Sequence, residues 1–352
     1  MKFNPEMLVL AREAKGIVQD KFAGLLKVSQ GTVSRWESGL LEPSPTAVGE
    51  FSDHLDVTPE FFYRADRVYG FNSTVFFHRR RQSGMDMFLR KLHARMNILR
   101  MRIASLLRSA EIQTPYQFEH FDVGEYRGRV EVIAQMVRSL WRMPPGYVRS
   151  MVKAIEDAGG ILYHMDFETN KIDAISEWIY GYPPIVLVNS NAEIPLSRLR
   201  LTLAHELGHL VLHQSSVPSP IEEEANRYAG EFLMPRREIK ASLYRLTLEK
   251  LMDLKQEWKV SMAALVYHAH RLGTITPAQF RYLNINLRRR WGICEPLEEY
   301  IPDEPASLLA EMVNAHVRGL HFSTGEMAQM LFYTKVKHFE RDFLGVGEMR
   351  LV

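Results

Sequence analysis

Two histidines and a glutamate at helical spacing form the segment of this chain most able to carry chemistry. Residues 202–209 read T-L-A-H-E-L-G-H. Residues four apart lie one above the other on a helix, so His205 and His209 can direct two imidazoles at one metal ion. Glu206 then projects beside them toward a water at that ion. The pattern is typical of zinc metalloproteases, which place two ligands and a general base on two turns of helix.

The residues around this motif weigh against a chance match. A motif this short also occurs in ordinary helices, with the polar side chains simply exposed to solvent. Here the flanking residues predict a buried helix, because they are apolar on several sides: Leu201, Leu203, Ala204, Leu207, Leu210 and Leu212. Histidine and glutamate side chains on a buried helix need polar partners or a metal.

A catalytic zinc needs a third protein ligand, and the segment 220–235 offers carboxylates for it. The apolar spacing predicts a helix whose buried face is bordered by Glu222 and Asn226, four residues apart. Such a pair suits a ligand and a neighbour that orients the site. Glu223 falls on an exposed side, and Glu224 remains an alternative ligand.

Two further side chains are candidates for orienting the ligands or stabilising the transition state. His213 continues the stripe of His205 and His209 by another four residues, and Tyr228 lies on the predicted second helix. The sequence does not decide which of them has which role.

The elements before the motif predict a small sheet packed on its helix. Residues 161–165 and 184–189 are apolar runs, and residues 172–179 alternate apolar and polar. An exposed edge of such a sheet can pair with an extended peptide. The sequence does not indicate which strand lies at that edge.

The N-terminal segment predicts short helices at 5–15, 19–26 and 30–37, and a further helix at 46–55. The turn at 27–29 ends in Ser29, a good N-cap for the third helix. Two short helices joined by such a turn form a helix-turn-helix, whose second helix lies in the major groove of DNA.

Residues 8–62 resemble the XRE family of repressor-like helix-turn-helix domains, chiefly through the run S-Q-G-T-V-S-R-W-E-S-G at 29–39. The resemblance implies double-stranded DNA as a partner. It implies contacts to bases or phosphates from Gln19, Gln30, Thr32, Val33 and Arg35. Residues 1–65 are slightly acidic, which disfavours phosphate binding, so a domain kept only for protein contacts is the alternative.

Residues 150–275 resemble the ImmA/IrrE family of metallopeptidases. The matching positions are 196–209, Leu212-His213, Ile221-Glu222, Ala225-Asn226, Ala229 and 233–235. The resemblance implies zinc ligands at His205, His209 and Glu222, with Glu206 as the general base. It also implies that the substrate is a specific protein such as a repressor or antitoxin, in circuits that include the stress response.

Composition places these segments in a multidomain chain. Its 352 residues exceed one typical core, its net charge is +2, and its single cysteine excludes an internal disulfide. With no long apolar run and no leader pattern, the expected location is cytoplasmic. The fold expected is α+β and mostly helical, divided as helix-turn-helix domain 1–66, helical connector 67–150, peptidase domain 151–285 and C-terminal helical region 286–352. The acidic, proline-containing stretch 295–305 is interpreted as a linker.

These observations together predict a regulator that binds DNA, cleaves a specific protein through a zinc-dependent endopeptidase site, and controls gene expression. A homodimer is compatible with this interpretation. The alternative is a non-enzymatic transcriptional regulator or antitoxin in which the zinc domain is structural or sensory.

Overall fold

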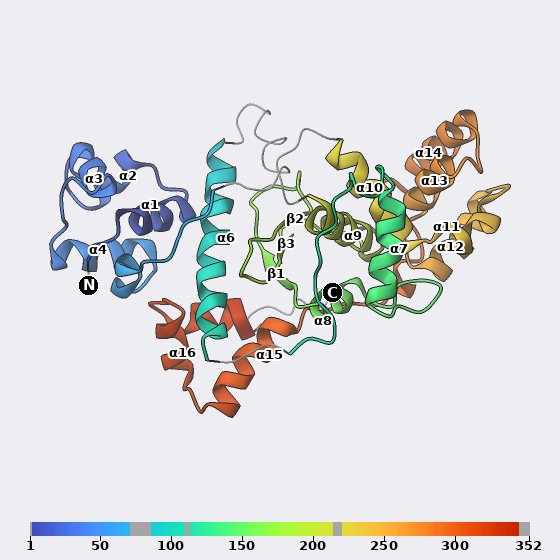
Figure 1. Cartoon of the computed structure of the whole chain (residues 1–352). Helices are drawn as coiled ribbons and strands as arrows, with labels where there is room; N and C mark the ends of the chain where they lie inside the picture. Colours follow the sequence, from blue (N-terminus) through green and yellow to red (C-terminus); the bar gives the residue numbers. More distant parts are fainter. Residues whose placement is uncertain (1, 71–85, 110–112, 214–219, 345–352) are drawn as a thin grey trace. The chain divides into compact units, whose positions relative to one another are not determined.

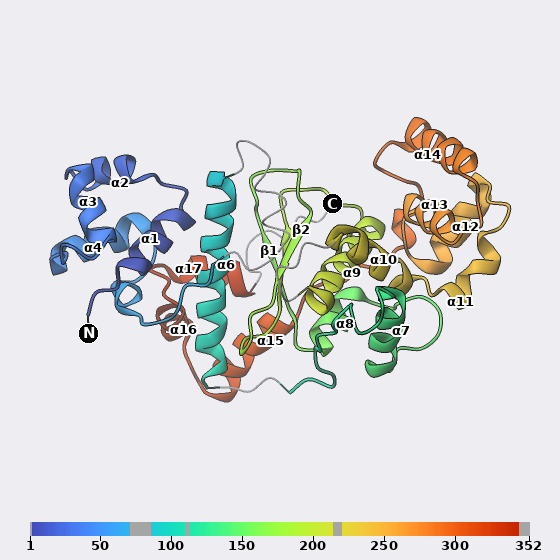
Figure 2. The ribbon, with the colours of Figure 1, turned by 45° about the horizontal axis from the view of Figure 1, so that its top comes forward.

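The chain folds into two compact units. The computed structural model describes residues 2–70, 86–109, 113–213 and 220–344. The first unit comprises residues 1–112 together with 308–352, and the second comprises residues 113–307. Helices dominate both units, and the second holds one small sheet (Figures 1 and 2). The mostly helical α+β class predicted from the sequence is confirmed.

Short helices begin the first unit. They are α1 (Pro5–Ala14), α2 (Gln19–Leu25), α3 (Gln30–Glu37), α4 (Pro45–Leu55) and the 3-10 helix η1 (Pro59–Tyr63). Ser29 caps α3 by accepting a hydrogen bond from the backbone N–H of Thr32. The backbone of Lys27 turns between α2 and α3 with a positive φ of 54°. These two helices form the predicted helix-turn-helix.

The C-terminal segment returns to pack on this N-terminal domain. It follows α6 (Asp86–Leu107) in the same unit and contains α15 (Leu308–Asn314), η4 (Ala315–Gly319), α16 (Thr324–Met330), α17 (Val336–Phe339) and η5 (Glu340–Leu344). The ring centroids of Phe332 and Phe61 lie 5.8 Å apart. The backbone carbonyl of Phe332 accepts a hydrogen bond from the backbone N–H of Thr58. The far end of the sequence thus completes the core of the first unit.

The second unit is built around a three-stranded sheet in the order β1-β3-β2. Its strands are β1 (Ile161–Met165), β2 (Ala174–Glu177) and β3 (Ile185–Asn189). The central strand β3 pairs in parallel with β1 and antiparallel with β2. Every residue of β3 is buried, as its uninterrupted apolar run predicts. β1 and β2 are therefore the two edges of the sheet.

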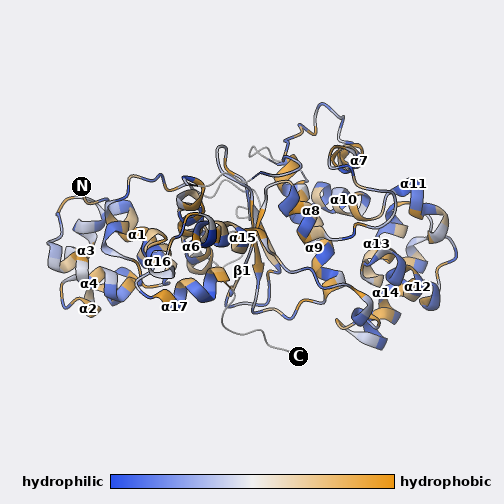
Figure 3. Ribbon diagram, turned by 90° about the horizontal axis from the view of Figure 1, so that it is seen from below, coloured by the Kyte–Doolittle hydropathy of each residue, from blue (hydrophilic) through white to orange (hydrophobic). Residues whose placement is uncertain are grey.

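Helices surround this sheet. They are α7 (Val130–Leu140), α8 (Met151–Asp157), α9 (Leu196–Leu212), α10 (Ile221–Leu233), α11 (Arg236–Ile239), η2 (Lys240–Leu243), α12 (Leu248–Trp258), α13 (Met262–Arg271), α14 (Pro277–Trp291) and η3 (Glu298–Tyr300). Figure 2 shows α9 beside the sheet and α10 beside α9. Figure 3 shows hydrophobic and hydrophilic residues on the same helices, which is typical of elements that bury one face.

A glycine allows α9 and α10 to approach closely. A Cβ atom added at Gly208 would lie 3.2 Å from the Cα atom of Ala225 and 3.2 Å from the ring of Tyr228. Such contacts are tighter than ordinary van der Waals packing, so a larger residue at position 208 would push the helices apart. The glycine of the H-E-L-G-H sequence is therefore explained by helix packing.

The stretch expected to be a linker, 295–305, instead binds to the second unit. Glu295 accepts hydrogen bonds from the backbone N–H groups of Met262 and Ala263 at the start of α13. Both Glu295 and Glu298 pair with the fully buried ammonium group of Lys255. Acidic side chains at helix N-termini and beside a buried cation have specific partners, so this acidic segment is part of the folded unit.

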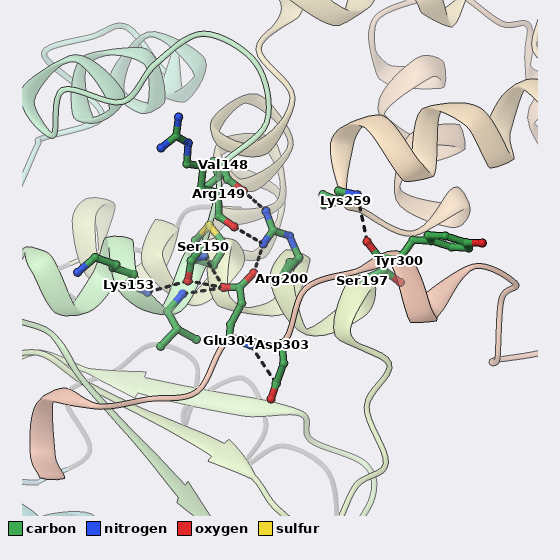
Figure 4. A network of polar contacts seen from close by, with 12 residues as sticks. Val148, Arg149, Ser150, Lys153, Ser197, Arg200, Lys259, Tyr300, Asp303 and Glu304 are labelled. Carbon is green, nitrogen blue, oxygen red and sulfur yellow. Dashed lines mark hydrogen bonds and ion pairs between the residues drawn. The ribbon is translucent and has the colours of Figure 1, made fainter. Parts of the chain in front are cut away.

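Glu304 makes the most buried of these contacts (Figure 4). It pairs with Arg200 of α9, and the two side chains are 5% and 2% exposed. The same carboxylate accepts hydrogen bonds from the backbone N–H groups of Met151 and Val152 at the start of α8. One carboxylate therefore joins α8 to α9.

Removing this carboxylate should destabilise the second unit. Glu304→Gln leaves the guanidinium of Arg200 buried without its counter-charge, and we expect the free energy of unfolding to fall by about 3 kcal/mol. Urea denaturation of the second unit measures this change. The control is Glu299→Gln, at an exposed neighbouring position. Equal stabilities of the two variants would contradict the role given to Glu304.

No helix among the described residues is long and apolar enough to span a bilayer.

Candidate functional site

Three side chains from α9 and α10 converge on one point. The Nε2 atoms of His205 and His209 lie 3.0 Å apart, and each lies 3.5 Å from a carboxylate oxygen of Glu222. With zinc–nitrogen bonds of about 2.0–2.1 Å, tetrahedral ligand atoms would be about 3.4 Å apart. The three groups are thus spaced as ligands of a single ion, and their chemistry, two imidazoles and a carboxylate, suits zinc.

Asn226 orients the first histidine. Its side-chain oxygen lies 3.0 Å from Nδ1 of His205. An amide oxygen can only accept, so the Nδ1–H of His205 donates to it and leaves Nε2 with a free lone pair. The two residues expected to share a helical stripe, Glu222 and Asn226, therefore approach the same histidine. Burial works against protonation of His205, but Glu222 and Glu206 raise its pKa overall in the absence of a metal.

The second histidine has a different partner. Nδ1 of His209 lies 3.0 Å from Nδ1 of His213, whose Nε2 lies 3.0 Å from an oxygen of Glu224. Glu224 is thus directed at His213 and is absent from the three converging groups. Burial lowers the pKa of His213, although Glu224 opposes this effect.

The carboxylate of Glu206 is held by the sheet. Glu206 is only 2% exposed, and the hydroxyl of Ser176 donates a hydrogen bond to Oε2 of Glu206 at 2.7 Å. Ser176 lies on β2, an edge strand. The sequence predicts a sheet packed on α9, but its pattern does not indicate which residue of that sheet lies beside Glu206, so this serine was not predicted as part of the site.

The outer edge of β2 is buried, because Ala174 and Ser176 are only 1% and 2% exposed. The carbonyl of Asp173 accepts a hydrogen bond from Asn189 of the central strand. Inward and outward backbone groups alternate along an antiparallel strand, so those of Ala174 and Ser176 point to the outer edge. Within the described ranges no strand pairs with that edge.

Tyr228 lies in the core. Its residue is fully buried, its ring stacks on that of Phe232, and its hydroxyl has no hydrogen-bond partner among the described residues. Burial raises the pKa of this hydroxyl well above its usual value. The structure therefore places Tyr228 as a packing residue between α9 and α10, and no contact joins its hydroxyl to the three converging groups.

The helix-turn-helix brings together two of the residues expected to contact DNA. The side-chain amide of Gln30 donates to Gln19 at 2.7 Å, and Gln19 donates to Glu37 at 2.6 Å. Glu37 in turn forms a bidentate ion pair with Arg12. This network, of which sequence reasoning found only the two glutamines, fixes α2 against α3.

The remaining expected DNA contacts differ in exposure. Arg35 is exposed, and Thr32 is half-buried with its hydroxyl 2.9 Å from that of Ser29. Val33 is fully buried in the core of the first unit, so the expectation that it faces bases is corrected. The signal was present in the sequence, because Val33 and Trp36 are three residues apart and share the apolar stripe of α3.

Comparison with known families matches both parts of the chain. Residues 156–270 match the family model described as the IrrE N-terminal-like domain, a peptidase family, and residues 8–62 match the helix-turn-helix model. Both resemblances stated from the sequence are thereby confirmed. A search of curated proteins finds no match.

Loss of Glu222 should remove the metal. Glu222→Ala deletes one of three ligand atoms, so we expect the purified variant to lose its zinc on dialysis while the wild type retains it. Elemental analysis measures the zinc content per chain. Glu223→Ala, which removes an exposed carboxylate from the same turn, is the matched control. Full zinc retention by Glu222→Ala would contradict the ligand assignment.

Proposed function

We propose that this chain, which joins a helix-turn-helix domain to an IrrE-like domain of a peptidase family, is a DNA-binding regulator that acts as a zinc-dependent endopeptidase. The observation that carries the proposal is the convergence of His205, His209 and Glu222, with the carboxylate of Glu206 on the adjacent helix position. Two neutral imidazoles and one carboxylate leave a tetrahedral zinc with an open position, as catalytic zinc sites require.

In the proposed mechanism, a bound zinc ion supplies Lewis acidity that polarises the scissile carbonyl and makes water a better nucleophile. Glu206 accepts the proton of the attacking water and delivers it to the leaving amine. The hydrogen bond from Ser176 holds the Glu206 carboxylate in one orientation during both transfers. Because Glu206 is buried, little bulk water competes for its proton.

The attached helix-turn-helix favours a regulatory role over general protein degradation. A DNA-binding module has no evident use in a degradative protease, whereas it would place a regulatory peptidase at its target gene. Together with the resemblance to ImmA/IrrE metallopeptidases, this supports a repressor or antitoxin-like protein as the substrate. Expression would then change when that protein is cleaved, for example in a stress response in the cytoplasm.

The catalytic role of Glu206 has a direct test. Glu206→Gln keeps the size of the side chain but cannot accept a proton, so cleavage should fall by at least about 100-fold. The assay co-expresses the protein with a tagged repressor that the wild type cleaves and follows that repressor by immunoblot. Zinc content and thermal stability should stay at wild-type values, and Glu223→Gln should cleave normally. Cleavage that persists in Glu206→Gln would exclude the proposed mechanism. Unchanged regulation by Glu206→Gln without any cleavage would favour the non-enzymatic regulator.

The DNA-binding role has a separate test. Arg35→Ala removes an exposed cation from α3 and should weaken binding to the promoter of the protein's own gene by about 1–3 kcal/mol. Fluorescence anisotropy with a labelled promoter fragment measures this. Arg237→Ala, an equal charge change at an exposed position of the second unit, controls for non-specific attraction. If Arg35→Ala binds like the wild type, Arg35 makes no contact to DNA, and a wild type that does not bind the fragment would favour a domain that serves protein contacts.

A further inference from the structure

We propose that His213 and Glu224 form a hydrogen-bonded relay that holds His209 in its metal-binding tautomer, with Glu224 as a positioning residue for the centre. The proposal rests on the metal centre of the proposed function. It concerns His213 and Glu224, which are not among the three expected metal ligands.

The carboxylate of Glu224 sets the direction of both hydrogen bonds in the relay. An ionised carboxylate can only accept, so Nε2 of His213 carries the proton that lies toward Glu224. In a neutral ring the other nitrogen is then an acceptor, so Nδ1 of His213 accepts from Nδ1–H of His209. The Nε2 atom of His209 is left unprotonated, as a metal ligand must be.

The opposite arrangement would disable the site. If His213 donated from Nδ1, then Nδ1 of His209 would have to accept, and the proton of His209 would move to Nε2. That proton would point at Nε2 of His205, only 3.0 Å away, where the ion is expected. Glu224 prevents this because it fixes the donor end of the relay.

The two carboxylates of α10 have different surroundings. Glu222 and Glu224 are two residues apart, which is about 200° around a helix, so they cannot face the same point. The Glu222 side chain is 49% exposed, whereas those of Glu224 and His213 are 11% and 5% exposed. A ligand beside an open coordination position is reached by solvent, whereas a relay works best where water cannot replace its hydrogen bonds.

The two histidine ligands are thus oriented by unlike partners. His205 donates to a neutral amide, Asn226, and His209 donates through His213 to a carboxylate. A carboxylate at the end of the relay makes the imidazole of His209 the more basic ligand. The relay therefore raises the affinity of the site for the ion as well as orienting the ring.

Zinc affinity tests the relay without any assay of cleavage. Competition with a chromogenic chelator gives the dissociation constant of Zn2+ for the full-length protein. Glu224→Ala and His213→Leu should each raise it about 10- to 100-fold. Glu223→Ala, the same change at the neighbouring exposed position, should leave it unchanged. His213→Asn keeps an acceptor near Nδ1 of His209 and should recover part of the loss.

The tautomers themselves give a second readout, which a purely structural role would not change. In the metal-free protein labelled with 15N-histidine, the ring shifts should show His209 protonated at Nδ1 and His213 at Nε2. Glu224→Ala should convert these to mixtures, while circular dichroism shows an unchanged fold. Signals of His209 are identified by their loss in His209→Gln.

The outcomes separate the two proposals. Wild-type zinc affinity in Glu224→Ala, or His209 protonated at Nε2 in the metal-free wild type, would overturn the relay and leave the peptidase proposal intact. A wild-type protein that binds no zinc would overturn the proposed function, and the nitrogen shifts would still decide whether the relay exists.

Discussion

The close packing of α9 against α10 is the constraint on which the candidate site depends. Gly208 lets the two helices approach, and this approach brings the carboxylate of Glu222 to the imidazoles of His205 and His209. Ligand atoms must be within a few tenths of an ångström of their working positions, so a shift of one helix would separate them. The site is thus a property of the helix pair, and the rest of the second unit serves to hold that pair in place.

Two other contacts fix α9 from outside the pair. The edge strand β2 holds Glu206 through Ser176, and the segment after α14 holds Arg200 through Glu304. Arg200 precedes the motif along the helix, and Glu206 lies within it. Residues 271–307 lie beyond the part matched by the peptidase family model, yet their carboxylates bind groups on α8, α9 and α13. The second unit therefore extends well past that match.

The sequence predicted the parts of this arrangement that are local. The four-residue spacing of His205 and His209 and the stripe shared by Glu222 and Asn226 need only the geometry of a helix. Contacts between distant segments could not be predicted, since no local pattern indicates them. Ser176 beside Glu206 is one such contact, and Glu304 beside Arg200 is another. The acidic stretch 295–305 was interpreted as a linker because its composition resembles one, whereas its carboxylates in fact bind helix N-termini and buried cations.

Anomalous diffraction at the zinc absorption edge, from crystals of the full-length protein, would show where the ion binds. We expect one strong peak bonded to Nε2 of His205, Nε2 of His209 and the carboxylate of Glu222, with a fourth position free of protein ligands. A peak bonded to Glu224 or His213, or no peak between α9 and α10 in zinc-soaked crystals, would contradict this assignment.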